Sequence, residues 1–185
     1  MALQATVYNF DIELADHDRG LYESLALRVA RHPSESEEFL IARVLAYLLE
    51  YAEGIAFSRG VSDPDEPAIG IRDLTGAITA WIDIGTPDAA RLHKASKASA
   101  RVVVYTHKDP RPFLDRLAGE KIHRADTLEL YAIDRALIGA LVARLEKGIG
   151  HRVLVARGRR AVNFGESLKR EGRRIPSLQK NTLYF

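Results

Sequence analysis

The sequence predicts a mixed α/β fold in which a central mixed β-sheet is flanked by helices. Residues 6–14 and 22–31 alternate polar and apolar side chains, which is typical of two antiparallel strands that each bury one face. A helix predicted over 87–100 leads into the continuous apolar run 102–105, and this order favours a right-handed parallel crossover. A chain with both kinds of strand pairing is expected to form a mixed sheet.

A helix is expected after the first hairpin. Pro33 cannot donate to a strand ladder, and Ser34 followed three residues later by Glu37 has the spacing of a capping box. The sequence therefore predicts a helix over 35–51, with Glu37 in the middle of its apolar face. The helix is predicted to bury Ile41, Val44, Leu48 and Tyr51 and to expose Ala42, Arg43, Ala46 and Glu50.

Two more strands are predicted to form a hairpin in the middle of the chain. In the second of them the two-residue period puts Asp83 on the same face as Thr79 and Trp81, while the other face is apolar. Asp83 is thus a charged residue inside an otherwise apolar strand. The predicted segments are a short strand at 55–59, a loop at 62–67, and hairpin strands at 68–72 and 77–85.

Helices and strands continue to alternate in the second half. Thr86, Pro87 and Asp88 have the order of an N-cap followed by first-turn residues, so the next helix is expected to begin there. A length of 185 residues suits one domain, expected over 1–175 with 176–185 as a tail. The later segments are predicted as helices at 112–117 and 134–147, a strand at 128–133, and a terminal hairpin of 152–156 and 160–164.

Composition excludes several classes of protein. The chain has no cysteine, which excludes disulfides and thiolate metal sites, and no stretch approaches the roughly 20 apolar residues of a membrane span. A cytoplasmic protein without membrane association is expected. Residues 1–66 carry 13 acids against 5 bases, and residues 151–185 carry 9 bases against 2 acids. This asymmetry suits nucleic acid at one end and metal or a basic partner at the other, or else charges that meet in the folded domain.

Acidic residues at two neighbouring strands are the main candidates for chemistry. Asp65 and Glu66 stand at the entrance of one hairpin strand, and Asp83 lies on its partner. Carboxylates placed in this way can converge on one Mg²⁺ or Mn²⁺ ion, which activates water and neutralises charge on a phosphoryl group. The structural alternative is that the loop acids are solvated and that Asp83 forms an ion pair in the core.

Basic residues on the helix after Asp83 support a functional cluster. Arg91, Lys94 and Lys97 follow Asp83 closely, and buried acids near bases are typical of functional sites. The alternative interpretation pairs Asp83 with one of these bases, makes Glu37 a capping residue and leaves both lysines on a solvated face.

Several motifs of the first half together resemble the YaeQ family, and the match extends from the first strand through about Tyr105. The resemblance implies a variant of the PD-(D/E)XK core, a restriction-endonuclease-like fold shared by many metal-dependent nucleases; fold alone does not fix activity. The motifs are His32-Pro33-Ser34-Glu35, Arg43 and Ala46, Asp65-Glu66-Pro67, the run from Trp81 to Asp88, Arg91-Leu92 and Lys94-Ala95.

The resemblance implies roles for individual acids. Asp65 or Glu66 fills the first acid position and Asp83 the second, and Glu37 is a candidate third metal ligand. The usual motif has a lysine two residues after the second acid, where this chain has Gly85.

A lysine that reaches back from the following helix is the expected substitute for the missing one. Lys94 and Lys97 both remain candidates, and their reach depends on how the helix crosses the sheet.

Two functions are compatible with these residues. The first is a Mg²⁺- or Mn²⁺-dependent phosphodiesterase acting on DNA or RNA; the second is a catalytically silent module that binds nucleic acid or a protein partner. Trp81 is either a base-stacking residue or part of the core. The candidate nucleic-acid contacts are Arg91, Arg157, Arg159 and Arg160, the last three of which are alternatively solvated residues of a turn.

Overall fold

Two compact units make up the chain, and each contains a β-sheet of its own. The structure, a computed structural model, describes residues 5–58, 65–145, 150–158, 161–165 and 179–182, the last three ranges by their backbone only. Unit 1 comprises Met1–Leu40 and Asp134–Leu178, and unit 2 comprises Ile41–Ile133 and Gln179–Phe185. The chain passes from unit 1 to unit 2 after Leu40, back to unit 1 at Asp134 and again to unit 2 at Gln179, and the single domain expected over 1–175 stays a prediction. The predicted mixed α/β class is confirmed.

Unit 1 is built on the predicted N-terminal hairpin. Its four-stranded sheet has the order β2-β1-β8-β9, in which β1 and β8 are parallel and the other neighbours antiparallel. Alternate side chains of β1 are buried, as its sequence pattern predicts. The predicted terminal hairpin is present as β8 and β9. The elements are β1 (Thr6–Asp16), β2 (Leu21–Arg31), α4 (Arg135–Val142), β8 (Gly150–Gly158) and β9 (Ala161–Gly165).

Helix α1 (Glu37–Leu49) differs from the sequence prediction at its start and in its exposure. It begins two residues later because the Ser36 hydroxyl, rather than that of Ser34, accepts the backbone N–H of Phe39 at 3.2 Å. The side chains predicted to be exposed are buried: Ala42, Arg43, Ala46 and Glu50. Partners distant in sequence account for the two charged ones, since Arg43 lies over the Phe57 ring and Glu50 binds Arg101.

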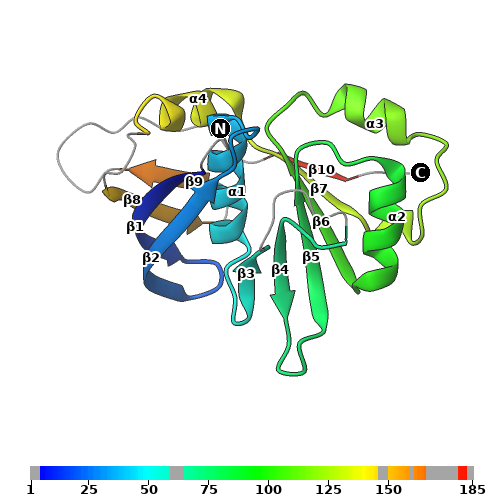
Figure 1. Ribbon diagram of the computed structural model, residues 1–185, viewed down its shortest axis with the longest axis horizontal. Coiled ribbons are helices and arrows are strands. Elements are labelled where there is room, and N and C mark those ends of the chain that lie inside the picture. The colour runs from blue at the N-terminus through cyan, green and yellow to red at the C-terminus, as the bar shows by residue number, and fades with distance from the viewer. Residues whose placement is uncertain (1–4, 59–64, 146–149, 159–160, 166–178, 183–185) are drawn as a thin grey trace. The chain divides into compact units, whose positions relative to one another are not determined.

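Unit 2 contains the mixed sheet that positions the candidate site (Figure 1). Its strand order is β10-β7-β6-β5-β4-β3; β5, β6 and β7 are parallel, and the other neighbours are antiparallel. Strand β10 lies within the segment expected to be a tail. The strands are β3 (Ile55–Phe57), β4 (Ile69–Arg72), β5 (Ile78–Ile84), β6 (Arg101–Thr106), β7 (Glu129–Ala132) and β10 (Gln179–Thr182).

Helices α2 (Ala89–Ala98) and α3 (Arg111–Leu117) pack on one face of this sheet. Helix α2 begins later than predicted because the Asp88 carboxylate, not Thr86, caps it by accepting the Arg91 N–H at 2.8 Å. A short 3₁₀ helix, η1 (Ala125–Thr127), precedes β7. The core on this face consists of Trp81, Leu92, Ala95, Val102, Val104, Phe113, Leu117, Leu128 and Leu130. Among the described helices, none has the length and apolar character needed to cross a bilayer.

Candidate functional site

Asp83 is the buried acid around which the candidate site is built. It lies on β5 on the same face as Trp81, as predicted, and only 2% of its surface is exposed. Arg91 binds its carboxylate through two hydrogen bonds, with Nε 2.7 Å from Oδ2 and Nη2 2.7 Å from Oδ1. Such a bidentate pair is among the stronger charge-assisted contacts in proteins. The alternative in which Asp83 pairs with a base of the next helix is therefore correct for Arg91.

The same arginine links Asp83 to the entrance of β4. Nη2 of Arg91 also donates to the backbone carbonyl of Glu66 at 2.9 Å, and the Ala68 N–H donates to Asp83 Oδ1 at 3.3 Å. The guanidinium carbon lies 5.5 Å from the centroid of the Trp81 ring. Asp83 thus faces the segment that carries the first two acids, as the sequence predicts.

Asp65 and Glu66 lie at the surface beside this buried pair. Asp65 forms an ion pair with Lys94, which is one helical turn beyond Arg91. The Glu66 carboxylate is 3.9 Å from a guanidinium nitrogen of Arg72. The two acids expected on the loop and the acid on β5 therefore each face a base. Lys94 thus reaches Asp65 and Lys97 is exposed, and the replacement of the motif lysine by either of them stays a prediction.

Other predicted site residues are placed elsewhere or are not described. Glu37 belongs to unit 1, where its carboxylate is 3.4 Å from the Tyr8 hydroxyl and 4.0 Å from Arg31. Arg157 lies on β8, of which only the backbone is described, and Arg159 and Arg160 lie outside the described residues. Their expected contacts with metal or nucleic acid stay predictions.

Gly85 stands two residues after Asp83, where the resemblance leads one to expect a lysine, and its backbone disfavours any side chain. Its φ angle is +94°, in the region that L-residues with a side chain rarely adopt. The N–H of Gly85 donates to the Tyr105 carbonyl at 2.8 Å, which ties this bend to β6. A lysine here would be strained, and the cationic group beside Asp83 comes from Arg91 of α2 instead.

The acidic side chains of this site would complete the coordination of a divalent cation only together with water and substrate oxygens. Among the residues that the structure describes, no group of three His, Cys, Asp or Glu side chains is close enough to hold a metal ion. Mg²⁺ usually needs only one or two protein carboxylates, because it retains waters and takes oxygens from the substrate. Asp83 with Asp65 or Glu66 meets that need in chemical type. Arg91 bonds both oxygens of Asp83, so a cation at this acid would share the carboxylate with that guanidinium.

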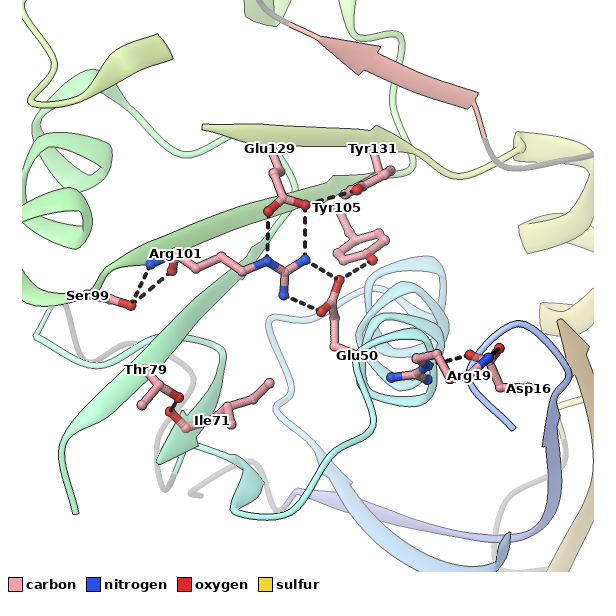
Figure 2. A network of polar contacts seen from close by, with 10 residues as sticks. All are labelled: Asp16, Arg19, Glu50, Ile71, Thr79, Ser99, Arg101, Tyr105, Glu129 and Tyr131. Atoms are coloured by element: carbon pink, nitrogen blue, oxygen red, sulfur yellow. Dashed lines mark hydrogen bonds and ion pairs between the residues drawn. The ribbon is translucent and has the colours of Figure 1, made fainter. Parts of the chain in front are cut away.

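Figure 2 shows a second ionic cluster, which was not predicted from the sequence. The Arg101 guanidinium binds Glu129 at 2.7 and 2.9 Å and Glu50 at 2.6 and 3.3 Å. Two phenols complete it, because Tyr105 donates to Glu50 at 2.6 Å and Tyr131 to Glu129 at 2.9 Å. The available signal was the opposite charge of Arg101 and Glu129 at the starts of two parallel strands. Glu50 gave no local signal, since its position on the helix favoured exposure.

Burial and charge shift the pKa values in this second cluster. Burial, reinforced by the Glu50 carboxylate, raises the pKa of Tyr105 well above its usual range. Burial and the hydrogen bond to Glu129 raise the pKa of Tyr131 to about 12. The bonds to Glu129 and Glu50 raise the pKa of Arg101. These groups hold their protons firmly, and the cluster is suited to joining α1, β6 and β7 rather than to proton transfer.

Comparison with known proteins places the chain among relatives. A family model described as YaeQ protein matches residues 1–168. The proteins named "Uncharacterized protein YaeQ" from Escherichia coli K12 and Salmonella typhi are 39% and 38% identical over 107 residues, which are 58% of this chain and 59% of each relative. The matched region thus covers about three fifths of the length of each of these curated relatives.

Two crystal structures of YaeQ proteins are similar over most of the chain. The protein from Pseudomonas syringae has a TM-score of 0.84 and 30% identity, with 99% of both chains covered. The protein from Xanthomonas axonopodis pv. citri has a TM-score of 0.78 and 33% identity, with 89% of this chain and 92% of that chain covered.

Proposed function

Because this chain belongs to the YaeQ protein family, whose curated relatives carry no activity in their names, we propose a function from the site itself. The protein is a phosphodiesterase that hydrolyses DNA or RNA with the help of Mg²⁺ or Mn²⁺. Its sheet with flanking helices is a variant of the PD-(D/E)XK core, and the site lies where β4 and β5 meet α2. The placement of Asp83 opposite the segment 65–68 supports both statements.

The observation that carries the proposal is the buried carboxylate of Asp83. A charged group on an apolar strand is costly unless it is paired, and natural cores rarely keep one without a role. This one sits 3.3 Å from the first residue after the Asp65–Pro67 segment and is bonded to a helix that also presents Lys94. The buried acid, the surface acids and the bases thus lie together where the strands β4 and β5 meet α2.

Each residue has a role that follows from its position. Asp83 and either Asp65 or Glu66 would hold the cation, which supplies activated water and charge neutralisation when bound. Lys94 is exposed and would exchange its ion pair with Asp65 for a phosphate oxygen when the substrate binds. Arg91 is fixed by its bonds to Asp83 and Glu66, so it orients the acid and offers its charge to the substrate backbone.

Calorimetric titration with Mn²⁺ tests the proposal. Wild type is expected to bind Mn²⁺, Asp83→Asn to lose that binding, and Asp126→Asn, which removes an exposed acid on η1, to retain it. Equal weak heats in all three proteins would contradict the metal site. Incubation of the same proteins with single-stranded and duplex DNA and RNA tests hydrolysis; products that form with wild type and Asp126→Asn but not with Asp83→Asn or chelator are expected.

A second candidate function is a catalytically silent module that binds nucleic acid or a protein. Two observations favour it: Arg91 already bonds both oxygens of Asp83, and Gly85 bends the chain where the motif lysine would stand. This alternative predicts binding that is indifferent to chelator and that tolerates Asp83→Asn when the protein stays folded. The titration above separates the two functions.

A further inference from the structure

An open pocket of about 430 Å³ adjoins the candidate site. Glu66 and Pro67, which continue directly from Asp65, form part of its lining, so pocket and site share one segment of chain. The volume falls within the range of small-molecule sites, which is about 300–1,000 Å³. The lining residues are Ala56, Phe57, Ser58, Glu66, Pro67, Gly70 and Arg72.

The floor of the pocket is made by the smallest side chains of two neighbouring strands. Ala56 of β3 pairs in register with Gly70 of β4, and Gly70 pairs with Trp81 of β5. Registered partners share a face of the sheet, so the floor lies on the face that carries Trp81 and Asp83. A Cβ at Gly70 would come 3.2 Å from Pro67 Cγ, so glycine keeps this floor low. The depth of the pocket therefore follows from the small residues at positions 56 and 70.

Two opposite charges line the pocket without being tightly bonded to one another. The Glu66 carboxylate and the Arg72 guanidinium are 3.9 Å apart, longer than a hydrogen bond, and their side chains are 36% and 42% exposed. Arg72 also donates from Nη1 to the Gly76 carbonyl at 3.1 Å, which anchors it and leaves donors for a ligand. The pocket thus offers an acceptor and a donor side by side.

We propose that this pocket is the subsite for one unstacked nucleotide of a single-stranded nucleic acid. The inference rests on the proposed function and adds the substrate class. With Asp65 as the acid that completes the cation site, the Glu66 carboxylate is left to accept from a base amine in the pocket, and Arg72 contacts a phosphate or base oxygen. A paired base cannot enter without being turned out of the duplex, which costs free energy that a single strand does not lose. The next phosphate along the strand then lies toward Asp65 and Asp83.

Binding measurements with a pocket-filling variant test the assignment. Ala56→Leu adds volume to the floor at an exposed strand position, and Ala77→Leu makes the same change at an exposed alanine outside the pocket. Fluorescence anisotropy with short labelled single strands of DNA and RNA, in EDTA, is expected to show about tenfold weaker binding for Ala56→Leu and unchanged binding for Ala77→Leu. AMP is expected to shift the amide resonances of Ala56, Ser58 and Gly70 in wild type.

Several outcomes would overturn the inference. They are equal affinity in Ala56→Leu and wild type, equal loss in both leucine variants, AMP shifts confined to residues outside the pocket, and a matched duplex that binds as tightly as the single strand. Loss of Mn²⁺ binding and hydrolysis is a separate result. If neither the wild type nor any variant hydrolyses nucleic acid but Ala56→Leu selectively weakens binding, the nucleotide subsite is supported and the proposed hydrolysis is contradicted.

Discussion

The two ionic clusters of unit 2 lie on opposite faces of the same sheet and differ in how their charges are satisfied. Arg101 lies in register with Ala80, and the neighbouring Trp81 points with Asp83 to the other face. The Arg101 guanidinium donates to two carboxylates, and each carboxylate also accepts a hydrogen bond from a phenol. Around Asp83, one arginine holds the acid while Asp65, Glu66 and Lys94 remain at the surface beside a pocket.

This difference separates a structural cluster from a candidate functional one. A closed network fixes three elements and gives a ligand little to bind, because its acceptors are occupied. The open cluster keeps exposed charges beside the buried acid and shares Glu66 with a pocket, and these features are typical of binding sites. Buried charge alone therefore does not identify a site; a neighbouring pocket and exposed charges make the Asp83 cluster the better candidate.

Removal of Arg101 is expected to have the largest effect. Arg101→Met leaves Glu50 and Glu129 facing each other without a counter-charge, and the free energy of unfolding should fall by about 2–4 kcal/mol. Urea denaturation measures it. Arg111→Met removes an exposed partner of Asp109 and should cost less than about 1 kcal/mol. Similar losses in the two variants would mean that the Arg101 network contributes no more than a surface pair.

A double-mutant cycle on Asp83 and Arg91 is expected to give the next largest effect. Asp83→Asn and Arg91→Gln should each destabilise the fold, and their coupling free energy should be about 1.5–3 kcal/mol because the pair is bidentate and mostly buried. The measurement is urea denaturation of the two single variants and the double variant. A coupling near zero would show that the pair does not form in solution.

Alkaline pH should weaken the closed cluster. The folded pKa of Tyr105 and of Tyr131, about 12 for the latter, lies above the unfolded value near 10, so the unfolded chain loses these protons first. The stabilisation is complete below about pH 10 and is lost as pH rises through the folded pKa, by about 1 kcal/mol once solvent exposure is allowed for. Denaturation at several alkaline pH values measures it. Tyr131→Phe should flatten the dependence, and an unchanged slope would contradict this cause.

The smallest effect on stability is expected in the open cluster. Asp65→Asn removes an exposed ion pair with Lys94 and should change the free energy of unfolding by less than about 1 kcal/mol. If Asp65 is the first acid of the site, the same variant loses Mn²⁺ affinity and hydrolysis while remaining folded. Retained activity in Asp65→Asn together with lost activity in Glu66→Gln would assign the role to Glu66.

Much of the fold could be predicted because its signals are local. The alternation in β1 and β5 and the apolar run of β6 each lie within one element, and all three strands are present where expected. The face of Asp83 also follows from the period of its own strand. The choice of Arg91 as its partner, over Lys94 or Lys97, required the position and cap of α2, which begins two residues later than expected.

What could not be predicted depends on partners far apart in sequence. Glu50 is buried because Arg101, 51 residues away, reaches it, and no pattern within α1 carries that information. The pocket depends on the register of Ala56 with Gly70, which the sequence of either strand leaves open. Small residues are common in any sequence, and Ala56 and Gly70 form the pocket floor only because their strands pair in this register.

The bend at Gly85 limits how this site can change. A single substitution that introduced lysine at this position would place a side chain on a backbone at φ +94°, at a cost of about 1–2 kcal/mol. Relief of this strain would need a rearrangement of the strand end and of its bond to Tyr105. A further cationic group beside Asp83 is for this reason better introduced on α2 than at the end of β5.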